Sequence, residues 1–299
     1  MEKLPPAAGA SSPFCTTPPK VSSILKRRII NYSVWEMNQI NYQAINIGFG
    51  NLADEYDKLQ QTNNTVKLMR NKFYETVIQT VPILSYILEL NCGSGIDAHY
   101  FASKGYRVLA TDISDKMLEN AAAKGKKQNL EFRNINNTEL NKLKGKRFEA
   151  VISNLGGLNC IDDLTPLVSE IKSLVKPEGY FICTVMPRLS LWELALIFKG
   201  EFRRAVRRIR RKGTIANVGD EPVYVKYYSP SDLKKYLKDD FNLIYTRALR
   251  IFSPPPPADI WRFKHPFITS LLEKLDNRVE TFYPASFVCD NFISVFKKK

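Results

Sequence analysis

The middle of the chain alternates between short apolar runs and longer amphipathic segments. The apolar runs occupy residues 85–91, 107–112, 130–134, 148–154 and 180–186. Helix-length segments separate them at residues 97–104, 115–127 and 164–175. Strands that are apolar on both faces and alternate with helices are typical of a parallel sheet covered by helices on both sides. The pattern therefore predicts an α/β fold.

Before this region the pattern is less regular. Residues 1–20 are rich in Pro, Ala, Ser and Thr and have no hydrophobic period, so we predict a disordered tail. Aromatic and aliphatic residues across 21–60 predict short helices, and a further helix is predicted over 65–80, ending near Pro82. Together, residues 21–80 are expected to form an N-terminal helical lid.

After residue 186 the alternation stops. Residues 189–212 predict a pair of helices interrupted at Gly200, and residues 229–237 a helix capped by Ser229 or Ser231. Two more strands are predicted at 241–248 and 287–296, with a helix at 268–279 between them. We place a cap insertion at about 187–228, within a main domain of residues 81–299.

Charge is the unusual feature of the composition. The 299 residues are 44% hydrophobic and 25% charged, which suits one globular domain, but the net charge is +14. Eight basic residues and one acid, Glu201, lie between Lys199 and Lys212. Such a concentration makes nucleic acid, an anionic membrane or an acidic substrate a candidate partner.

The cysteines predict neither a disulfide framework nor a metal site. They are odd in number and no two have a CxxC spacing: Cys15, Cys92, Cys160, Cys183 and Cys289. We expect reduced, buried thiols in a cytoplasmic protein. No apolar run reaches the roughly 18 residues that a membrane span needs, and the N-terminus lacks the pattern of a secretion signal.

The strongest chemical signal is a glycine turn between the first strand and the first helix. The segment reads Glu89-Leu90-Asn91-Cys92-Gly93-Ser94-Gly95, and the next strand ends in Asp112. Glycines permit positive φ and a close approach of ligand to backbone, and the helix that follows offers free N–H groups. An acid at the end of the second strand can accept both hydroxyls of a ribose.

This geometry suits either a dinucleotide or S-adenosylmethionine. A dinucleotide fingerprint needs Gly-x-Gly-x-x-Gly, but its third position here is Ala98. Glu89 would also repel a pyrophosphate, whereas it favours the cationic methionine end of S-adenosylmethionine. The residues therefore favour S-adenosylmethionine over a nicotinamide cofactor.

The segment 89–95 resembles motif I of the class I S-adenosylmethionine-dependent methyltransferases, (D/E)-x-G-x-G-x-G, with Asn91 in place of the first glycine. Asn tolerates the left-handed region best after Gly. The resemblance spans about residues 54–296 and is closest to small-molecule methyltransferases of type 11. It implies a Rossmann-like, seven-stranded mixed sheet and S-adenosylmethionine as cofactor.

The same resemblance assigns further positions. Asp112 would bind the ribose, Ile113 would flank the adenine, and Asn136 with Ile135 would occupy the place of the adenine-binding motif. Ser153 and Asn154, at the end of the fourth strand, would approach the methionine moiety. The cofactor-binding residues expected on these grounds are Glu89, Asn91, Gly93, Gly95, Asp112, Ile113, Ile135, Asn136 and Asn154.

No catalytic residue follows from the pattern. The proline pair of the amino-methylating enzymes is absent after Asn154, where the chain continues Leu155-Gly156. Methyl transfer needs a general base only when the acceptor atom is protonated. The two weak candidates are His265 and Tyr56; the latter resembles a lid tyrosine of small-molecule methyltransferases. The other histidine, His99, is expected to be structural.

The acceptor remains open at this stage. Residues 202–210 have the spacing of an amphipathic basic helix, which allows a solvated cap helix, a helix at an anionic membrane surface or an RNA contact. We expect methyl transfer to a small, lipophilic molecule, with peripheral membrane contact through 189–212. The rivals are an RNA methyltransferase and a catalytically inactive membrane-surface protein of the same fold.

Overall fold

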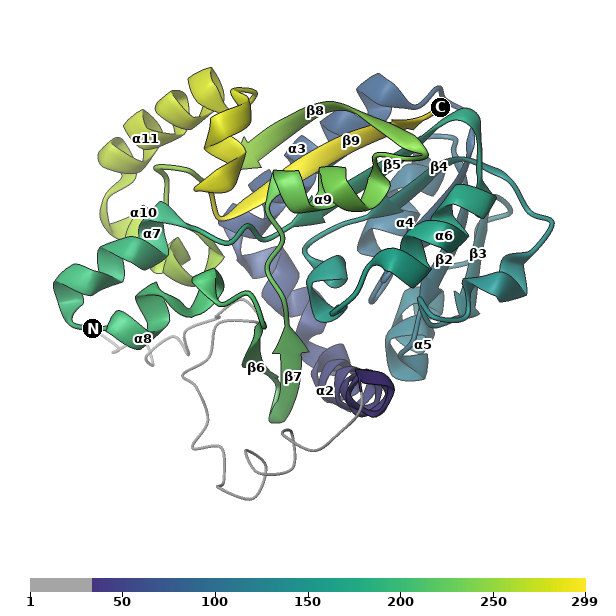
Figure 1. The fold of residues 1–299 in the computed structure, drawn as a ribbon, viewed down its shortest axis with the longest axis horizontal. Coiled ribbons are helices and arrows are strands. Elements are labelled where there is room, and N and C mark those ends of the chain that lie inside the picture. The colour runs from purple at the N-terminus through teal and green to yellow at the C-terminus, as the bar shows by residue number, and fades with distance from the viewer. Residues whose placement is uncertain (1–33) are drawn as a thin grey trace, which may run out of the picture.

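Seven strands form the main sheet of the computed structural model, which describes residues 34–299, with side chains from residue 41 onward (Figure 1). The strands are β1 (Tyr86–Leu90), β2 (Arg107–Asp112), β3 (Leu130–Asn134), β4 (Phe148–Ser153), β5 (Val175–Val185), β8 (Phe241–Leu249) and β9 (Asn291–Lys298). Their order across the sheet is β3-β2-β1-β4-β5-β9-β8. The predicted tail 1–20, Cys15 and residues 21–33 of the predicted short helices lie outside the described residues.

The first five strands run parallel, and β9 is antiparallel to both of its neighbours, β5 and β8. Successive side chains of β1 pack on opposite faces: Leu88 and Leu90 join one apolar cluster and Ile87 joins another. Both faces of the sheet are therefore buried, which explains the continuous apolar runs in the sequence. The predicted seven-stranded mixed sheet is confirmed.

Helices cover both faces of the sheet. One face packs against α3 (Asn64–Thr80) and α4 (Ile96–Ser103), the other against α6 (Thr165–Leu174) and α9 (Pro230–Leu237). Of the two predicted caps of α9, Ser229 is the one used: its hydroxyl accepts a bond from the N–H of Asp232 and completes a capping box. Because β1 to β5 run parallel, the loops after these strands lie at one edge of the sheet.

The N-terminal region differs from the prediction. The sequence suggested short helices over 21–60, but residues 34–62 form one helix, α2 (Val34–Thr62). Tyr42 and Ile45 of α2 pack on Val223 and Val225 of a two-stranded sheet, β6 (Thr214–Val218) and β7 (Glu221–Val225). The sequence did not predict this hairpin. Its packing against α2 explains why α2 continues as one helix. Helix α2 also packs against α5 (Asp115–Ala123), and the two lie at the lower end of the molecule in Figure 1.

The cap, residues 187–228, begins with helical turns rather than two regular helices. These are α7 (Leu191–Leu194), η3 (Ala195–Lys199), α8 (Phe202–Ala205) and η4 (Arg207–Ile209). The predicted break at Gly200 is present, with φ +73°. The predicted continuous amphipathic helix over 202–210 is wrong. In a continuous helix the side chains of neighbouring residues point about 100° apart. Here the helix breaks at Val206, and the neighbours Arg207 and Arg208 both form ion pairs with Glu193.

The long connection between the last two strands forms η5 (Pro256–Ala258), α10 (Asp259–Lys264), α11 (Pro266–Val279) and η6 (Tyr283–Phe287). Together with α7 and α8, these elements occupy the left side of Figure 1, away from β3 and α5. Two smaller turns complete the description, η1 (Leu140–Leu143) and η2 (Gly157–Cys160). Among the described helices, none combines the length and apolarity needed to cross a bilayer.

Candidate active site

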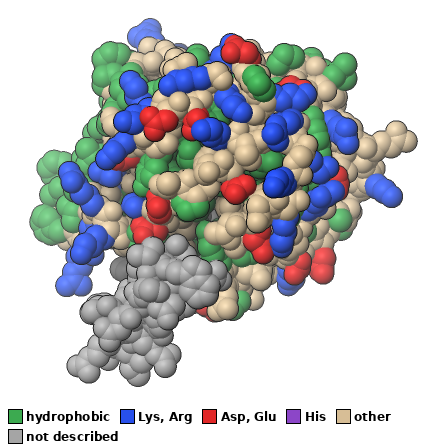
Figure 2. All heavy atoms as spheres, turned by 45° about the vertical axis from the view of Figure 1, so that its right-hand side comes forward, with side chains coloured by type: hydrophobic (Ala, Val, Ile, Leu, Met, Phe, Trp, Pro, Cys, Tyr) green, Lys and Arg blue, Asp and Glu red, His purple; other side chains and the backbone are tan. Residues whose placement is uncertain are grey.

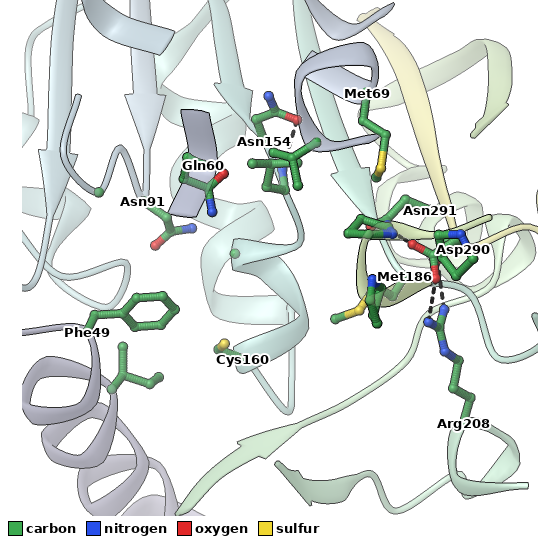
Figure 3. A pocket seen from close by; sticks show the side chains of 18 of the residues that line it. Phe49, Gln60, Met69, Asn91, Asn154, Cys160, Met186, Arg208, Asp290 and Asn291 are labelled. Carbon is green, nitrogen blue, oxygen red and sulfur yellow. Dashed lines mark hydrogen bonds and ion pairs between the residues drawn. The ribbon is translucent and has the colours of Figure 1, made fainter. Parts of the chain in front are cut away.

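A pocket of about 350 Å³ opens at the carboxyl ends of β1, β2 and β4 (Figure 3). Strand β1 has β2 on one side and β4 on the other, so the connections after β1 and β4 leave in opposite directions. This topological switch point is where open α/β sheets bind ligands. The pocket continues from the glycine turn to the cap, where Trp192 and Leu196 line it.

The backbone of the glycine turn has the expected left-handed conformations. Asn91 has φ +56° and Gly93 has φ +54°. Both residues line the pocket. A Cβ atom built on Gly93 would meet only the ring of Tyr56, at 3.7 Å, so the tyrosine of α2 lies over this residue. Gly93 therefore keeps the backbone open toward the pocket.

The second glycine has a different role from the one predicted. Gly95 does not line the pocket; it caps α4 with φ +73°. A Cβ atom there would lie 2.8 Å from Ala121 and 2.9 Å from the ring of Phe132. Gly95 is thus required because α4 packs closely on α5 and β3, and not because a ligand approaches it.

Asp112 lies at the end of β2 and lines the pocket beside the turn. One carboxylate oxygen accepts the N–H of Gly93 at 2.7 Å and the other accepts the N–H of Ser114 at 2.9 Å. Burial raises the pKa of this carboxyl, while the N–H groups of Ser114 and Gly93 oppose that rise. Each oxygen retains acceptor capacity for a hydroxyl group.

Beneath the turn lies a buried polar cluster that the sequence did not reveal. Asp97, in the first turn of α4, accepts bonds from Arg70 and from the hydroxyl of Tyr74, at 2.6 Å in the latter case. Its other oxygen accepts Asn154 Nδ2 at 2.9 Å. The only sequence signal was an acid directly after the turn, with no indication that α3 supplies its partners.

Glu89 is buried beside this cluster, and its Oε2 has no hydrogen-bond partner in the described structure. Burial, and then the charge of Asp97, raise the pKa of Glu89 well above its usual range, and Arg70 only partly opposes the rise. A buried carboxylate that lacks a partner favours a cation close by. This corner of the site is therefore suited to a positively charged group.

The remaining predicted positions surround the same pocket. Ile113, Ile135, Asn136 and Asn154 all line it, the two isoleucines from the loops after β2 and β3. Asn154 Oδ1 accepts the hydroxyl of Thr184 at 3.0 Å, so this side chain is fixed in place. The structure thus brings seven of the nine expected residues to the pocket wall and leaves Glu89 and Gly95 behind it.

Of the two weak catalytic candidates, one lines the pocket and the other does not. Tyr56 lines the pocket, and burial raises the pKa of its hydroxyl to about 12, with Arg70 opposing the rise. The hydroxyl is therefore protonated near neutral pH and cannot serve as a base. His265 is exposed at the start of α11, with its ring tilted against that of Trp261, and does not line the pocket. His99, expected to be structural, bonds the carbonyl of Ala121.

The cap end of the pocket rests on a second buried cluster. Arg208 donates to Glu193 at 2.8 Å and to the carboxylate of Asp290 at 2.8 Å (Figure 3). Burial alone would raise the pKa of Glu193, but the guanidinium groups of Arg208 and Arg207 outweigh it and lower that pKa. Glu193 therefore remains ionised, and the contacts of Arg208 with Glu193 and Asp290 tie the cap to the start of β9.

The part of the chain that builds this site matches a known protein family. Residues 88–183, from β1 to β5, match the profile of the family described as "Methyltransferase domain". These residues include the glycine turn, Asp112 and Asn154. Residues 88–183 thus form a methyltransferase domain, and its glycine turn and Asp112 agree with the class I S-adenosylmethionine-dependent methyltransferases.

Relatives of this methyltransferase agree with the assignment. It is 26% identical over 160 residues to the demethylmenaquinone methyltransferase of Leptospira interrogans, covering 50% of this chain and 64% of that protein. It is 28% identical over 172 residues to the malonyl-[acyl-carrier protein] O-methyltransferase of Salmonella typhimurium, covering 56% and 64%. The chain thus matches slightly less than two thirds of the length of these relatives.

Among solved structures, the fold is similar to an S-adenosylmethionine-dependent methyltransferase from Clostridium acetobutylicum. The TM-score is 0.51 at 16% identity, with 83% of this chain and 97% of that chain covered. At this identity the likeness concerns the fold alone.

The pocket fits the cofactor of this family. Asp112 can accept ribose hydroxyls, and Ile113 and Ile135 offer apolar contacts for an adenine. Glu89, whose Oε2 has no partner, lies behind the pocket wall and can favour the cationic methionine end through its charge, not by lining the pocket. S-adenosylmethionine supplies a methyl group on a sulfonium, which is already activated for displacement. Gln60 and Met69, which the sequence analysis did not select, also line the pocket (Figure 3).

Proposed function

We propose that the methyltransferase transfers a methyl group from S-adenosylmethionine to a small, lipophilic acceptor bound beneath the cap. One observation carries the proposal: a single pocket runs from Gly93 to Trp192, and beyond the cofactor end apolar side chains line it together with charged residues of the cap. Its apolar walls there include Val66, Met69, Ile161, Met186, Trp192, Leu196 and residues 255–258. Apolar lining with a few polar groups is typical of small-molecule sites.

In this proposal the protein acts mainly by positioning. Displacement at the methyl carbon requires the acceptor atom opposite the sulfur, and a site closed to water protects that geometry. Tyr56 covers the turn and, with its pKa of about 12, can donate a hydrogen bond near the reacting groups. The acceptor would approach from the side of Met186 and Trp192.

The lining also restricts the acceptor atom. Among the described residues that line the pocket there is no histidine. At the acceptor end the carboxylates of Glu193 and Asp290 are held by Arg208, and that of Glu201 is paired with Arg204. We therefore expect an acceptor that needs no base from the protein, such as an acidic hydroxyl or a carboxylate that is ionised near neutral pH. The names of the two relatives, demethylmenaquinone and malonyl-[acyl-carrier protein] methyltransferase, indicate acceptors other than nucleic acid.

The test combines binding and turnover. Calorimetry with S-adenosylhomocysteine should show one site per chain. Incubation with labelled S-adenosylmethionine should then label a product from an organic-solvent extract of host cells and none from the aqueous fraction. Asp112→Ala serves as the inactive control.

Three outcomes would overturn the proposal. Absence of cofactor binding would remove its basis. Labelling of RNA with a steep dependence on salt would favour an RNA methyltransferase. Cofactor binding without turnover on any fraction would indicate a protein that retained the fold but not the activity.

A further inference from the structure

Helix α11 is oriented with its apolar side outward. Phe267, Leu271 and Leu275 recur every four residues and therefore lie on one face of the helix. They are 83%, 52% and 37% exposed, and Ile268 beside them is 47% exposed. A surface helix normally turns such a stripe toward the core.

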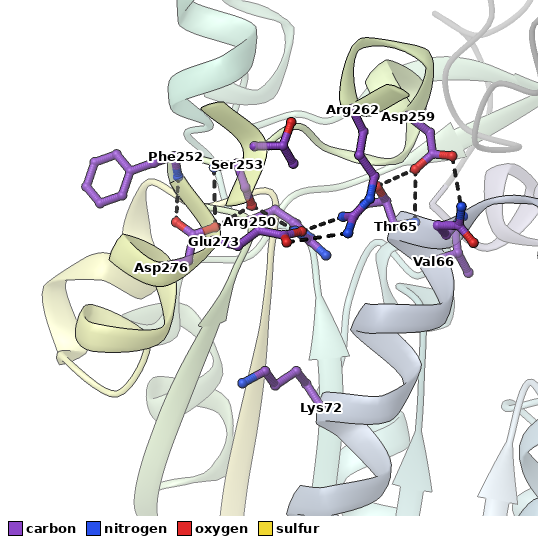
Figure 4. A network of polar contacts seen from close by, with 12 residues as sticks. Thr65, Val66, Lys72, Arg250, Phe252, Ser253, Asp259, Arg262, Glu273 and Asp276 are labelled. Carbon is purple, nitrogen blue, oxygen red and sulfur yellow. Dashed lines mark hydrogen bonds and ion pairs between the residues drawn. The ribbon is translucent and has the colours of Figure 1, made fainter. Parts of the chain in front are cut away.

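The inward side of the same helix is polar (Figure 4). Glu273 accepts a bond from Arg250 at 2.6 Å and pairs with Arg262 of α10. Asp276 is buried and accepts the N–H of Phe252 at 2.8 Å. Helix α11 is thus attached by ion pairs and hydrogen bonds, so its outward apolar stripe is not needed to hold it.

The cap shows the same arrangement next to it. Phe198 is 93% exposed and Phe202 is 62% exposed, on either side of Gly200. On α10, Phe263 is 63% exposed. The rings of Trp192 and Trp261 meet edge to face, 5.6 Å apart, and join the cap to α10. The two apolar regions are therefore neighbours.

Most of the exposed apolar side chains gather here. Of the twenty large apolar side chains that are exposed among the described residues, six lie within 191–209 and nine within 252–283. Hydrophobic side chains also gather along the left edge of the molecule in Figure 2. We call the exposed residues of 191–212 and 260–278 the cap–α11 surface. A contiguous apolar surface of this kind marks an interaction site.

The charges on this surface have one sign. Every charged residue that is exposed within 191–212 and 260–278 is basic: Lys199, Arg203, Arg210, Arg211, Lys212, Lys264, Lys274 and Arg278. The acids of these segments are Glu193, Glu201, Glu273 and Asp276, which are buried or partly buried and held in ion pairs or hydrogen bonds. Apolar side chains framed by Lys and Arg are the signature of binding to anionic lipid.

The same segments form the acceptor end of the pocket. Leu196 and Lys199 line the pocket while Phe198 between them points to solvent. Residues 255–258 line it from the other side and lead directly into α10. A molecule leaving a bilayer at this surface would thus reach the pocket without crossing the exterior of the protein.

We propose that the cap–α11 surface docks on an anionic phospholipid bilayer. A symmetric dimer through this surface would bring eight basic residues against the same eight. An RNA contact would use aromatic rings between the basic residues, and Phe198, Phe202 and Phe263 could supply them. The aliphatic side chains of Ile268, Leu271 and Leu275 favour lipid instead, and RNA binding is an outcome of the test. The role of docking in acceptor delivery rests on the proposed function, but the docking itself does not.

The experiment is cosedimentation of the full chain with vesicles. Binding to phosphatidylcholine vesicles that contain phosphatidylglycerol should exceed binding to phosphatidylcholine alone and should decrease as salt increases. The paired substitutions Phe198→Glu and Phe267→Glu should weaken binding at least about tenfold, because they place acids in the apolar contact. Arg210→Glu with Arg211→Glu should also weaken it, by removing attraction to anionic lipid.

Matched controls lie elsewhere on the molecule. Ile83→Glu changes a side chain that is 62% exposed at the start of β1, and Lys126→Glu with Lys144→Glu reverses two exposed charges. Both should bind vesicles as the parent protein does. Calorimetry with S-adenosylhomocysteine should be unchanged in all variants, which separates loss of docking from loss of the cofactor site.

Several results would overturn the docking proposal. One is failure to bind anionic vesicles at low salt; another is binding that the phenylalanine substitutions leave unchanged. Light scattering that shows a dimer dissolved by the same substitutions would assign the surface to a second copy. Salt-dependent binding to RNA, with none to vesicles, would assign it to nucleic acid. If docking fails while lipid-extract labelling persists, the proposed function stands without it.

Discussion

The two halves of the methyltransferase distribute apolar and charged side chains in opposite ways. Around the sheet, apolar side chains fill the interior and one small polar cluster at Asp97 interrupts them. In the cap and α10–α11, charged groups such as Arg208 and Glu273 lie inside while phenylalanines face outward. The sheet half is thus stable through its own core, whereas the acceptor half depends on ion pairs.

This difference shows what each half is suited for. A rigid, close-packed core holds the cofactor residues at fixed positions. A region with no buried residue in α7 or η3, and only Ala205 buried in α8, has little apolar packing of its own. Its outward apolar residues are better suited to an apolar environment outside the protein. The two halves should therefore respond to different substitutions, the sheet half to changes in packing and the acceptor half to the loss of ion pairs.

The largest effect is expected for Arg208→Ala. It leaves Glu193 and Asp290 buried with reduced compensation, and breaking a buried pair costs about 3–5 kcal/mol. Denaturant unfolding should show this loss, and proteolysis should cut within 189–212 first. Arg210→Ala, an exposed neighbour, should change stability by no more than about 0.5 kcal/mol. Equal effects of the two substitutions would show that the ion pairs do not hold the cap.

Asp112→Ala tests the cofactor half. Two hydrogen bonds from a charged group to ribose hydroxyls contribute about 3 kcal/mol together, so the dissociation constant for S-adenosylhomocysteine should rise by on the order of 100-fold. Calorimetry measures the change. The cap should remain attached, as shown by unchanged proteolysis within 189–212. An unaltered affinity would mean that the ribose lies elsewhere.

Gly95→Ala and Gly93→Ala compare two glycines of the same turn. Both have positive φ, but only at Gly95 does the new methyl group overlap Ala121 and Phe132. We expect Gly95→Ala to lower the free energy of unfolding by about 2–3 kcal/mol and Gly93→Ala by about 1 kcal/mol, the cost of the left-handed backbone. Thermal unfolding without cofactor measures both. Equal losses would show that packing at Gly95 adds nothing.

The sequence predicted the sheet half well because its signals are local. Its central strands are nearly continuous apolar runs, and the turn at Asn91 and Gly93 carries its own conformational requirement. The role of Gly95 could not be predicted, since it depends on α5 and β3 packing across the sheet.

The acceptor half was predicted poorly because its contacts are long-range. Arg208 pairs with Asp290, which is 82 residues away, and this pairing breaks the helix that the local pattern favoured. The outward orientation of α11 has the same cause: its periodicity was visible over 268–279, but which side faces inward depends on Arg250 and Arg262. Polar contacts between distant segments leave no periodic trace in a sequence.

The smallest effect is expected for Glu89→Gln, which should raise the free energy of unfolding but weaken the binding of the cofactor. Burial and Asp97 raise the pKa of Glu89 in the folded protein, so the folded state binds more protons than the unfolded state above the unfolded pKa. The free energy of unfolding of the parent protein should therefore fall as pH rises from about 4.5. Glu89→Gln removes that fall and should raise the free energy of unfolding by about 1 kcal/mol at neutral pH.

Glu89→Gln should also weaken cofactor binding about tenfold, because the cationic methionine end loses the nearby charge of this carboxylate. Denaturant unfolding at acidic and neutral pH, with calorimetry at neutral pH, measures both effects. A variant that is less stable and binds the cofactor unchanged would place Glu89 in the structural core and outside the site.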